Sequence, residues 1–156
     1  MSGRMYSVVF SAVAASLAQD LFELIPAANK PIEIVGIELG QTSDAGDAAD
    51  EILQISIIRG FTSGGSGGSA ATPTPMGPND TAAGFTAEVN NTTVATTGTT
   101  TTLQTGAWNV RAGYINWFPE EARPQCSAAN TSIVVRQTAP ADAITMSGTL
   151  YVRELI

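Results

Sequence analysis

Residues Ile144–Leu155, ITMSGTLYVREL, alternate between apolar and polar side chains. The apolar set consists of Met146, Leu150 and Val152. The polar set, on the opposite side of an extended chain, consists of Thr145, Ser147, Thr149 and Tyr151. A period of two residues is typical of a β-strand with one buried and one wet face. We therefore predict a strand over this segment.

The same pattern, separated by Gly, Pro, Asn and Asp, recurs along the chain. We predict further strands at 5–15, 20–25, 32–39, 52–59, 84–89, 94–103, 108–118 and 131–138. In 32–39 the apolar parity shifts between Ile34 and Val35, beside Gly36, which predicts a β-bulge. About eight or nine short strands predict an all-β fold, a single antiparallel β-sandwich or barrel of jelly-roll type with long loops.

The chain is poor in charge for its length. It has 156 residues, 13% of them charged, and a formal net charge of −7. Globular proteins average roughly 25% charged residues. An acidic chain with few basic residues is a poor ligand for nucleic acid phosphates, so we expect no nucleic acid partner.

Residues 62–79, TSGGSGGSAATPTPMGPN, have the composition of a flexible linker. A two-domain interpretation would divide the chain here, but 1–60 contains too few strands for a sandwich of its own. We therefore expect one β domain over 1–156, with this segment as a long loop between two strands. We expect a neighbouring surface to hold the loop, and a neighbouring subunit is the simple candidate.

The N-terminal residues 1–18 imitate a secretory signal, with an arginine, an apolar stretch and small residues. The alternation of Tyr6, Val8 and Phe10 with Ser7 and Val9 favours a β-strand instead. No stretch is long and apolar enough to predict a membrane-spanning helix, so we expect a soluble protein with no membrane partner.

The acidic segment 42–51 is a weak calcium candidate. Its carboxylates are those of Asp44, Asp47, Asp50 and Glu51. Their spacing does not match an EF-hand loop, and a solvated acidic turn is the alternative.

No residue pattern predicts catalysis or a cofactor. The chain has no histidine, which excludes a histidine base or metal ligand. Its single cysteine, Cys126, has no base beside it in sequence, and an unreactive thiol is the simpler interpretation. We expect a protein that is not an enzyme and that holds no cofactor.

Both tryptophans lie in 108–118, WNVRAGYINWF. Such aromatics can form a subunit interface, a sugar-binding platform or part of the core. With the N-terminal strand, they give these interface candidates: Met5, Tyr6, Trp108, Arg111, Tyr114, Trp117 and Phe118.

Sheet edges that lack lysine and are rich in Thr and Val need covering, by a closed barrel or by other subunits. We therefore expect a homo-oligomer with closed cyclic symmetry, most simply a trimer.

The chain resembles the capsid decoration, or cement, proteins of tailed bacteriophages. The resemblance rests on MSGRMYSVVFSAVA, IEIVGIELGQTSDAGDAADEILQISIIRG, NVRAGY and ITMSGTLYVRELI. It implies a mostly β protein, often trimeric, made in the bacterial host and bound to major capsid protein on the outer surface of an icosahedral head. It implies no active site. The alternative from another class is a carbohydrate- or receptor-binding β-sandwich of a phage tail or adhesion protein.

Overall fold

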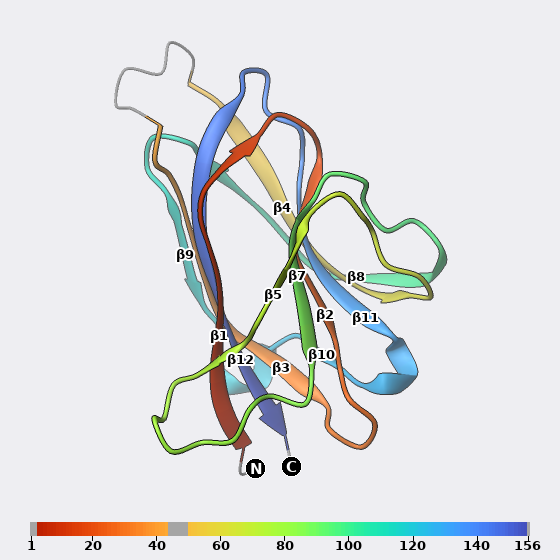
Figure 1. Ribbon diagram of the computed structural model, residues 1–156. Coiled ribbons are helices and arrows are strands. Elements are labelled where there is room, and N and C mark those ends of the chain that lie inside the picture. Colours follow the sequence, from red (N-terminus) through yellow and green to blue (C-terminus); the bar gives the residue numbers. More distant parts are fainter. Residues whose placement is uncertain (1–2, 44–49, 156) are drawn as a thin grey trace.

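Strand β12 (Ile144–Leu155) lies inside the first of two antiparallel sheets (Figure 1). The computed structural model describes residues 3–43 and 50–155. Alternate residues of β12 are buried, and its neighbours are β1 on one side and β3 on the other. Both bounds of this strand and its buried face match the sequence prediction.

Each sheet has six strands. Sheet A has the strand order β10-β3-β12-β1-β6, and β9 also pairs with β3. Besides β12, its strands are β1 (Gly3–Ala15), β3 (Ile32–Gln41), β6 (Thr74–Pro75), β9 (Tyr114–Trp117) and β10 (Gln125–Cys126). Sheet B has the order β5-β7-β2-β11-β4-β8 and contains β2 (Gln19–Ile25), β4 (Ile52–Phe61), β5 (Ser69–Ala71), β7 (Thr86–Asn91), β8 (Gly98–Asn109) and β11 (Ser132–Gln137). Two 3₁₀ turns, η1 (Glu120–Ala122) and η2 (Ala128–Asn130), flank β10.

The predicted β-sandwich is confirmed, and the sheets of the described residues do not close into a barrel. The predicted number of strands is wrong, because there are twelve. The additional strands are β5, β6 and β10, which have only two or three residues each. Strands this short carry no readable alternation, so sequence reasoning took them for loop.

The predicted strand 108–118 is also wrong, because the chain reverses inside it. The side chain of Asn109 accepts a hydrogen bond from the backbone N–H of Arg111 at 2.9 Å, and the backbone C=O of Asn109 accepts one from Ala112, also at 2.9 Å. Gly113 follows in the left-handed region, at φ 77°. This turn assigns Trp108 to the end of β8 and starts β9 at Tyr114 in the other sheet.

The bulge predicted near Gly36 is confirmed. Gly36 lies opposite Tyr151 and Ile34 lies opposite Val152, so Val35 is the extra residue in β3. A second bulge lies in β1, between Phe10 and Val13. There Ala12 has a φ of 52°, and its N–H donates to the hydroxyl oxygen of Ser147 at 2.9 Å.

The long loop 62–79 is held by its own chain rather than by a neighbour. Ser66 exchanges two backbone hydrogen bonds of 2.9 Å with Thr93. The Glu23 carboxylate accepts the Gly65 N–H at 3.0 Å, and the Asn91 side chain accepts the Gly68 N–H at 3.2 Å. Strands β5 and β6 then attach the rest of the loop to β7 and β1. These contacts hold the loop within the chain itself, without the neighbouring subunit that was the simple candidate from the sequence.

The core lies between the two sheets and draws on both. Phe10 of sheet A meets Phe22 of sheet B with ring centroids 5.3 Å apart. Leu150 and Ile57 are fully buried. Full burial of such a side chain stabilises the fold by roughly 1.5–3 kcal/mol. The two sheets therefore share one hydrophobic core.

Candidate functional site

Three of the predicted interface residues belong to the core. Tyr6, Trp108 and Phe118 expose 0%, 3% and 8% of their surface. The Tyr6 hydroxyl donates to the C=O of Thr81, and the Trp108 indole N–H donates to the side chain of Gln137. These three side chains pack within the subunit, so the structure corrects their assignment to an interface.

The other candidates stay nearer the surface. Met5 and Tyr114 are half-buried. Arg111 is exposed and forms an ion pair with Asp50 at 2.9 Å. Trp117 is 52% exposed. Among the aromatics of 108–118, Trp117 therefore offers the largest free surface, on β9 at the side of sheet A (Figure 1).

Trp117 lies on the outer face of sheet A, the face turned away from sheet B. Its ring stacks on that of Tyr151, with centroids 4.7 Å apart and planes inclined by 29°. Gly36 separates the two residues in the sheet and lies opposite both of them. A Cβ atom at Gly36 would lie 2.6 Å from the Trp117 ring, so the glycine makes room for the stack. We call Trp117, Gly36 and Tyr151 the aromatic platform.

A second row of residues crosses the same face beside the platform. Ile115 lies opposite Glu38, Glu38 opposite Thr149, and Thr149 opposite Val9. Ile115 and Val9 are 71% and 55% exposed. The row therefore adds apolar surface at both ends.

A shallow hollow of about 350 Å³ opens along this row. Its lining residues include Glu38, Ile115, Ser147 and Thr149. Hydroxyl and carboxylate groups thus lie next to the exposed Ile115, and Trp117 lies in the adjoining row of the same face. This combination can contact either a protein surface or a sugar ring.

The Tyr151 hydroxyl donates to the Glu38 carboxylate at 3.3 Å. Partial burial raises the pKa of Tyr151 above its ordinary value, and the charge and hydrogen bond of Glu38 raise it further. Tyr151 is therefore a neutral hydrogen-bond donor at neutral pH, and its ring is held in place on the platform.

Sequence reasoning missed Tyr151 and Gly36 as partners of Trp117. The alternation in Ile144–Leu155 did place Tyr151 on the polar face of its strand, which is the outer face of sheet A. The pairing with Trp117 depends on strand order, because β9 and β12 both flank β3.

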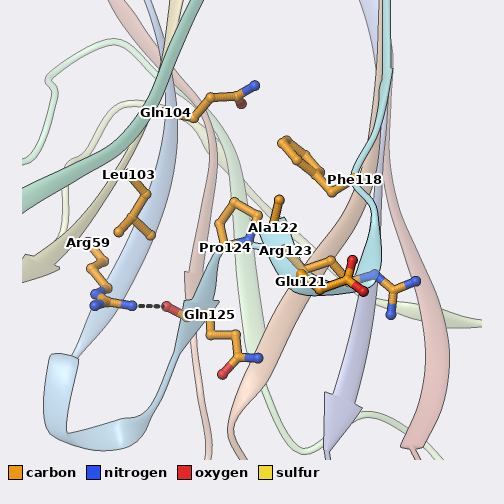
Figure 2. A pocket seen from close by; sticks show the side chains of 9 residues that line it. All are labelled: Arg59, Leu103, Gln104, Phe118, Glu121, Ala122, Arg123, Pro124 and Gln125. Atoms are coloured by element: carbon orange, nitrogen blue, oxygen red, sulfur yellow. Dashed lines mark hydrogen bonds between the residues drawn. The ribbon is translucent and has the colours of Figure 1, made fainter.

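A different cavity, of about 480 Å³, opens between the edges of the two sheets (Figure 2). Leu103 and Gln104 of β8 line one side, and Phe118 and Pro124 line the other. The Arg59 guanidinium reaches across and donates to the Gln125 C=O at 2.8 Å. Arg59 therefore ties the two sheets together at this edge.

Two of the calcium candidates lie outside the described residues, namely Asp44 and Asp47. The other two bind protein groups: Asp50 pairs with Arg111, and the buried Glu51 carboxylate accepts the backbone N–H groups of Ala141 and Asp142. Across residues 3–43 and 50–155, no cluster of three acidic or cysteine side chains is placed to bind a metal.

Cys126 is buried in β10, and burial raises its pKa to about 11. At neutral pH it is therefore a thiol, which is a poor nucleophile. Within the described part of the chain, no helix is long and apolar enough to cross a membrane.

No family model matches the chain, and no curated protein or solved structure was found to match it.

Proposed function

We propose that the chain is a non-enzymatic structural protein of a phage virion. In this proposal it forms a homotrimer, binds major capsid protein on the outer surface of an icosahedral head, and joins adjacent capsomers. In this proposal, the outer face of sheet A is the surface that contacts the capsid.

The observation that carries the proposal is the exposed apolar surface on this face. Trp117 and Ile115 lie on β9, and Val9 lies on β1 of the same sheet, with β3 and β12 between these strands. Aromatic residues are enriched where proteins bind one another, and exposed apolar side chains with polar groups between them are typical of such surfaces. The face is also pre-ordered, because Gly36 and Tyr151 hold the Trp117 ring in place.

The charge of the chain supports the same role. A net charge of −7 favours the outside of a shell over contact with packaged DNA. A protein that binds only the assembled shell stabilises that state by mass action, without any chemical step.

The test uses capsids of the virus that encodes this chain, assembled without it. Added protein is expected to sediment with these capsids in many copies and to raise their survival on heating. Trp117→Ala is expected to reduce the copies bound. Ile52→Ala is the matched control, because Ile52 is 72% exposed but lies at the start of β4 in sheet B.

Equal heat survival with and without the protein would contradict the stabilising role. The mass of the free protein in solution tests the trimer separately. A monomer at high concentration would contradict that part of the proposal.

A second candidate function is glycan binding. The specific observation is that the exposed Trp117 indole lies in the row next to that of Glu38 and Thr149, which line the hollow together with Ser147. A sugar ring can pack on the indole while these side chains bind its hydroxyl groups.

A glycan array with wild-type protein and Trp117→Ala separates the two functions. Glycan binding that Trp117→Ala abolishes would favour this second function. A change in tryptophan fluorescence on binding would locate the sugar at Trp117, since Trp108 is buried.

A further inference from the structure

Most of one edge of β1 is open. Strand β6 covers this edge only opposite Tyr6 and Ser7, and the Met76 N–H donates to the Met5 C=O at 2.8 Å just before them. In the part of the chain that the structure describes, no strand pairs with this edge from Val8 onward.

The backbone groups on this edge can be assigned from the bond at Met5. Backbone groups of alternate residues point to the same edge of a strand. Those of Ser7, Val9 and Ser11 therefore point the same way as those of Met5, up to the bulge at Ala12. Val9 and Ser11 are exposed, and neither is a proline or a lysine, the residue types that protect a sheet edge from pairing.

A groove of about 580 Å³ lies along this open edge. Val9, Ser11 and Val13 of β1 form one wall, and the glycine-rich segment at Gly67 and Ala70 forms the other. A groove of this volume can hold a few residues of extended chain, each of which adds about 3.3 Å to the length of a strand.

The groove is uncharged. All the residues that line it are apolar, small or neutral polar, in a protein whose net charge is −7. A charged occupant would lose its hydration without gaining an ionic partner here, so the lining selects for a neutral one.

The groove wall also contains an unsatisfied donor. Asn90, which is 6% exposed, accepts a hydrogen bond from Gln19 through its side-chain oxygen at 3.1 Å. Its side-chain NH₂ group is buried and has no partner. A buried donor without an acceptor costs roughly 1–3 kcal/mol, so this wall of the groove carries an uncompensated polar group.

We propose that the groove between β1 and the segment Gly67–Ala70 accepts an extended, uncharged segment of a partner protein, which adds to sheet A as a strand continuing the line of β6. Its backbone binds the free groups of Val9 and Ser11, and its small side chains fill the groove. Strand addition at a sheet edge is an established way for proteins to bind extended segments. The inference does not depend on the proposed capsid role.

A single strand fits this place better than the edge of a second copy. Strand β6 already pairs with this edge of β1 at Tyr6 and Ser7, so an added strand would extend an existing pairing. The segment around Gly67 and Ala70 stands on the other side of the groove, where a whole second sheet would have to pass.

The test is a titration of the ¹⁵N-labelled full chain with a neutral, end-capped peptide of about ten residues, alternating threonine and valine. We expect chemical-shift changes and slower amide exchange at Val9 and Ser11. A control peptide with alternate amides N-methylated cannot donate the hydrogen bonds of a strand, and it is expected not to bind.

Val9→Lys places a charge at the groove and is expected to weaken binding about tenfold or more, because the ammonium must be partly desolvated. Ile52→Lys is the matched control at an exposed residue of sheet B and is expected to bind as wild type. Three results would each overturn the proposal: no change at β1, equal binding of the N-methylated peptide, or a dimer that buries this edge without peptide.

Discussion

The buried carboxylates of the protein bind its own loops, whereas the outer face of sheet A presents an exposed aromatic ring to solvent. Of the twelve acidic residues that the structure describes, five are buried, namely Asp20, Glu23, Glu33, Glu51 and Glu154. By contrast, Trp117 and Ile115 are largely exposed. The buried charges all have partners within the chain, while the side chains of Trp117 and Ile115 have free surface.

Each of the five carboxylates holds a connection between strands. Asp20 and Glu154 are the clearest cases: the first accepts the Ala95 N–H at 2.9 Å, and the second accepts the Gly84 N–H at 2.7 Å. Charged groups in this protein therefore organise its long loops, and the apolar groups left outside are available to other molecules.

Removing the central buried ion pair is expected to have the largest effect. Asp20 is fully buried and lies 2.7 Å from Arg136, whose guanidinium also donates to the Ala95 C=O. Asp20→Ala leaves Arg136 without its charge partner and is expected to lower the free energy of unfolding by about 3–5 kcal/mol. Urea denaturation measures the change. A loss as small as that of an exposed pair would contradict the assigned role.

Adding a methyl group at Gly36, within the aromatic platform, is expected to have a smaller effect. Gly36→Ala would place a Cβ atom against Trp117 and displace its ring from Tyr151. The loss of the aromatic pair is expected to lower stability by about 1 kcal/mol. Trp117 fluorescence and thermal denaturation report the two consequences. Gly40→Ala is the matched control on the same strand, since no atom lies within 4 Å of a Cβ there.

The charge on Glu23 is expected to make stability depend on pH. Burial raises the pKa of Glu23 above its ordinary value, and the carboxylates of Glu88 and Asp20 add to the increase. A raised pKa in the folded state means that the contribution of Glu23 is complete below its unfolded pKa. That contribution is lost as the pH rises through the folded pKa.

Glu23→Gln keeps an acceptor for the Gly65 N–H without the charge. We therefore expect the free energy of unfolding of this variant, relative to that of wild type, to increase from acid to neutral pH. Denaturation across this pH range measures the difference. Glu23→Ala removes the acceptor as well and is expected to speed amide exchange at Gly65. Parallel pH profiles of wild type and Glu23→Gln would contradict the prediction.

An exposed ion pair is expected to have the smallest effect. Asp50 and Arg111 are 2.9 Å apart, but their side chains are 68% and 47% exposed. Solvent screens such a pair, so Asp50→Asn is expected to change stability by about 1 kcal/mol or less. A loss as large as that of Asp20→Ala would remove the distinction between buried and exposed charges.

The strands that alternate over many residues were predicted well, and the turns were not. Ile144–Leu155 was correct at both ends, and the parity shift beside Gly36 correctly located a bulge. The turn after Asn109 was missed, because apolar and aromatic residues continue through 108–118 and hide a local Asx hydrogen bond.

The platform was half predictable. Trp117 could be selected as an exposed aromatic candidate, but so were Trp108 and Phe118, which are buried. Burial of an aromatic residue depends on which sheet covers it, and this covering comes from residues far away in sequence.

The class of fold, the main strands and the lack of a histidine-based site could all be read from the amino-acid sequence, because alternation and composition are local properties. Three features became visible only in the folded molecule. Tyr151 supports Trp117, buried carboxylates hold the loops, and no strand of the described residues pairs with the edge of β1 from Val8 onward. These features depend on strand order and on contacts between distant segments, which the spacing of residues along the chain does not specify.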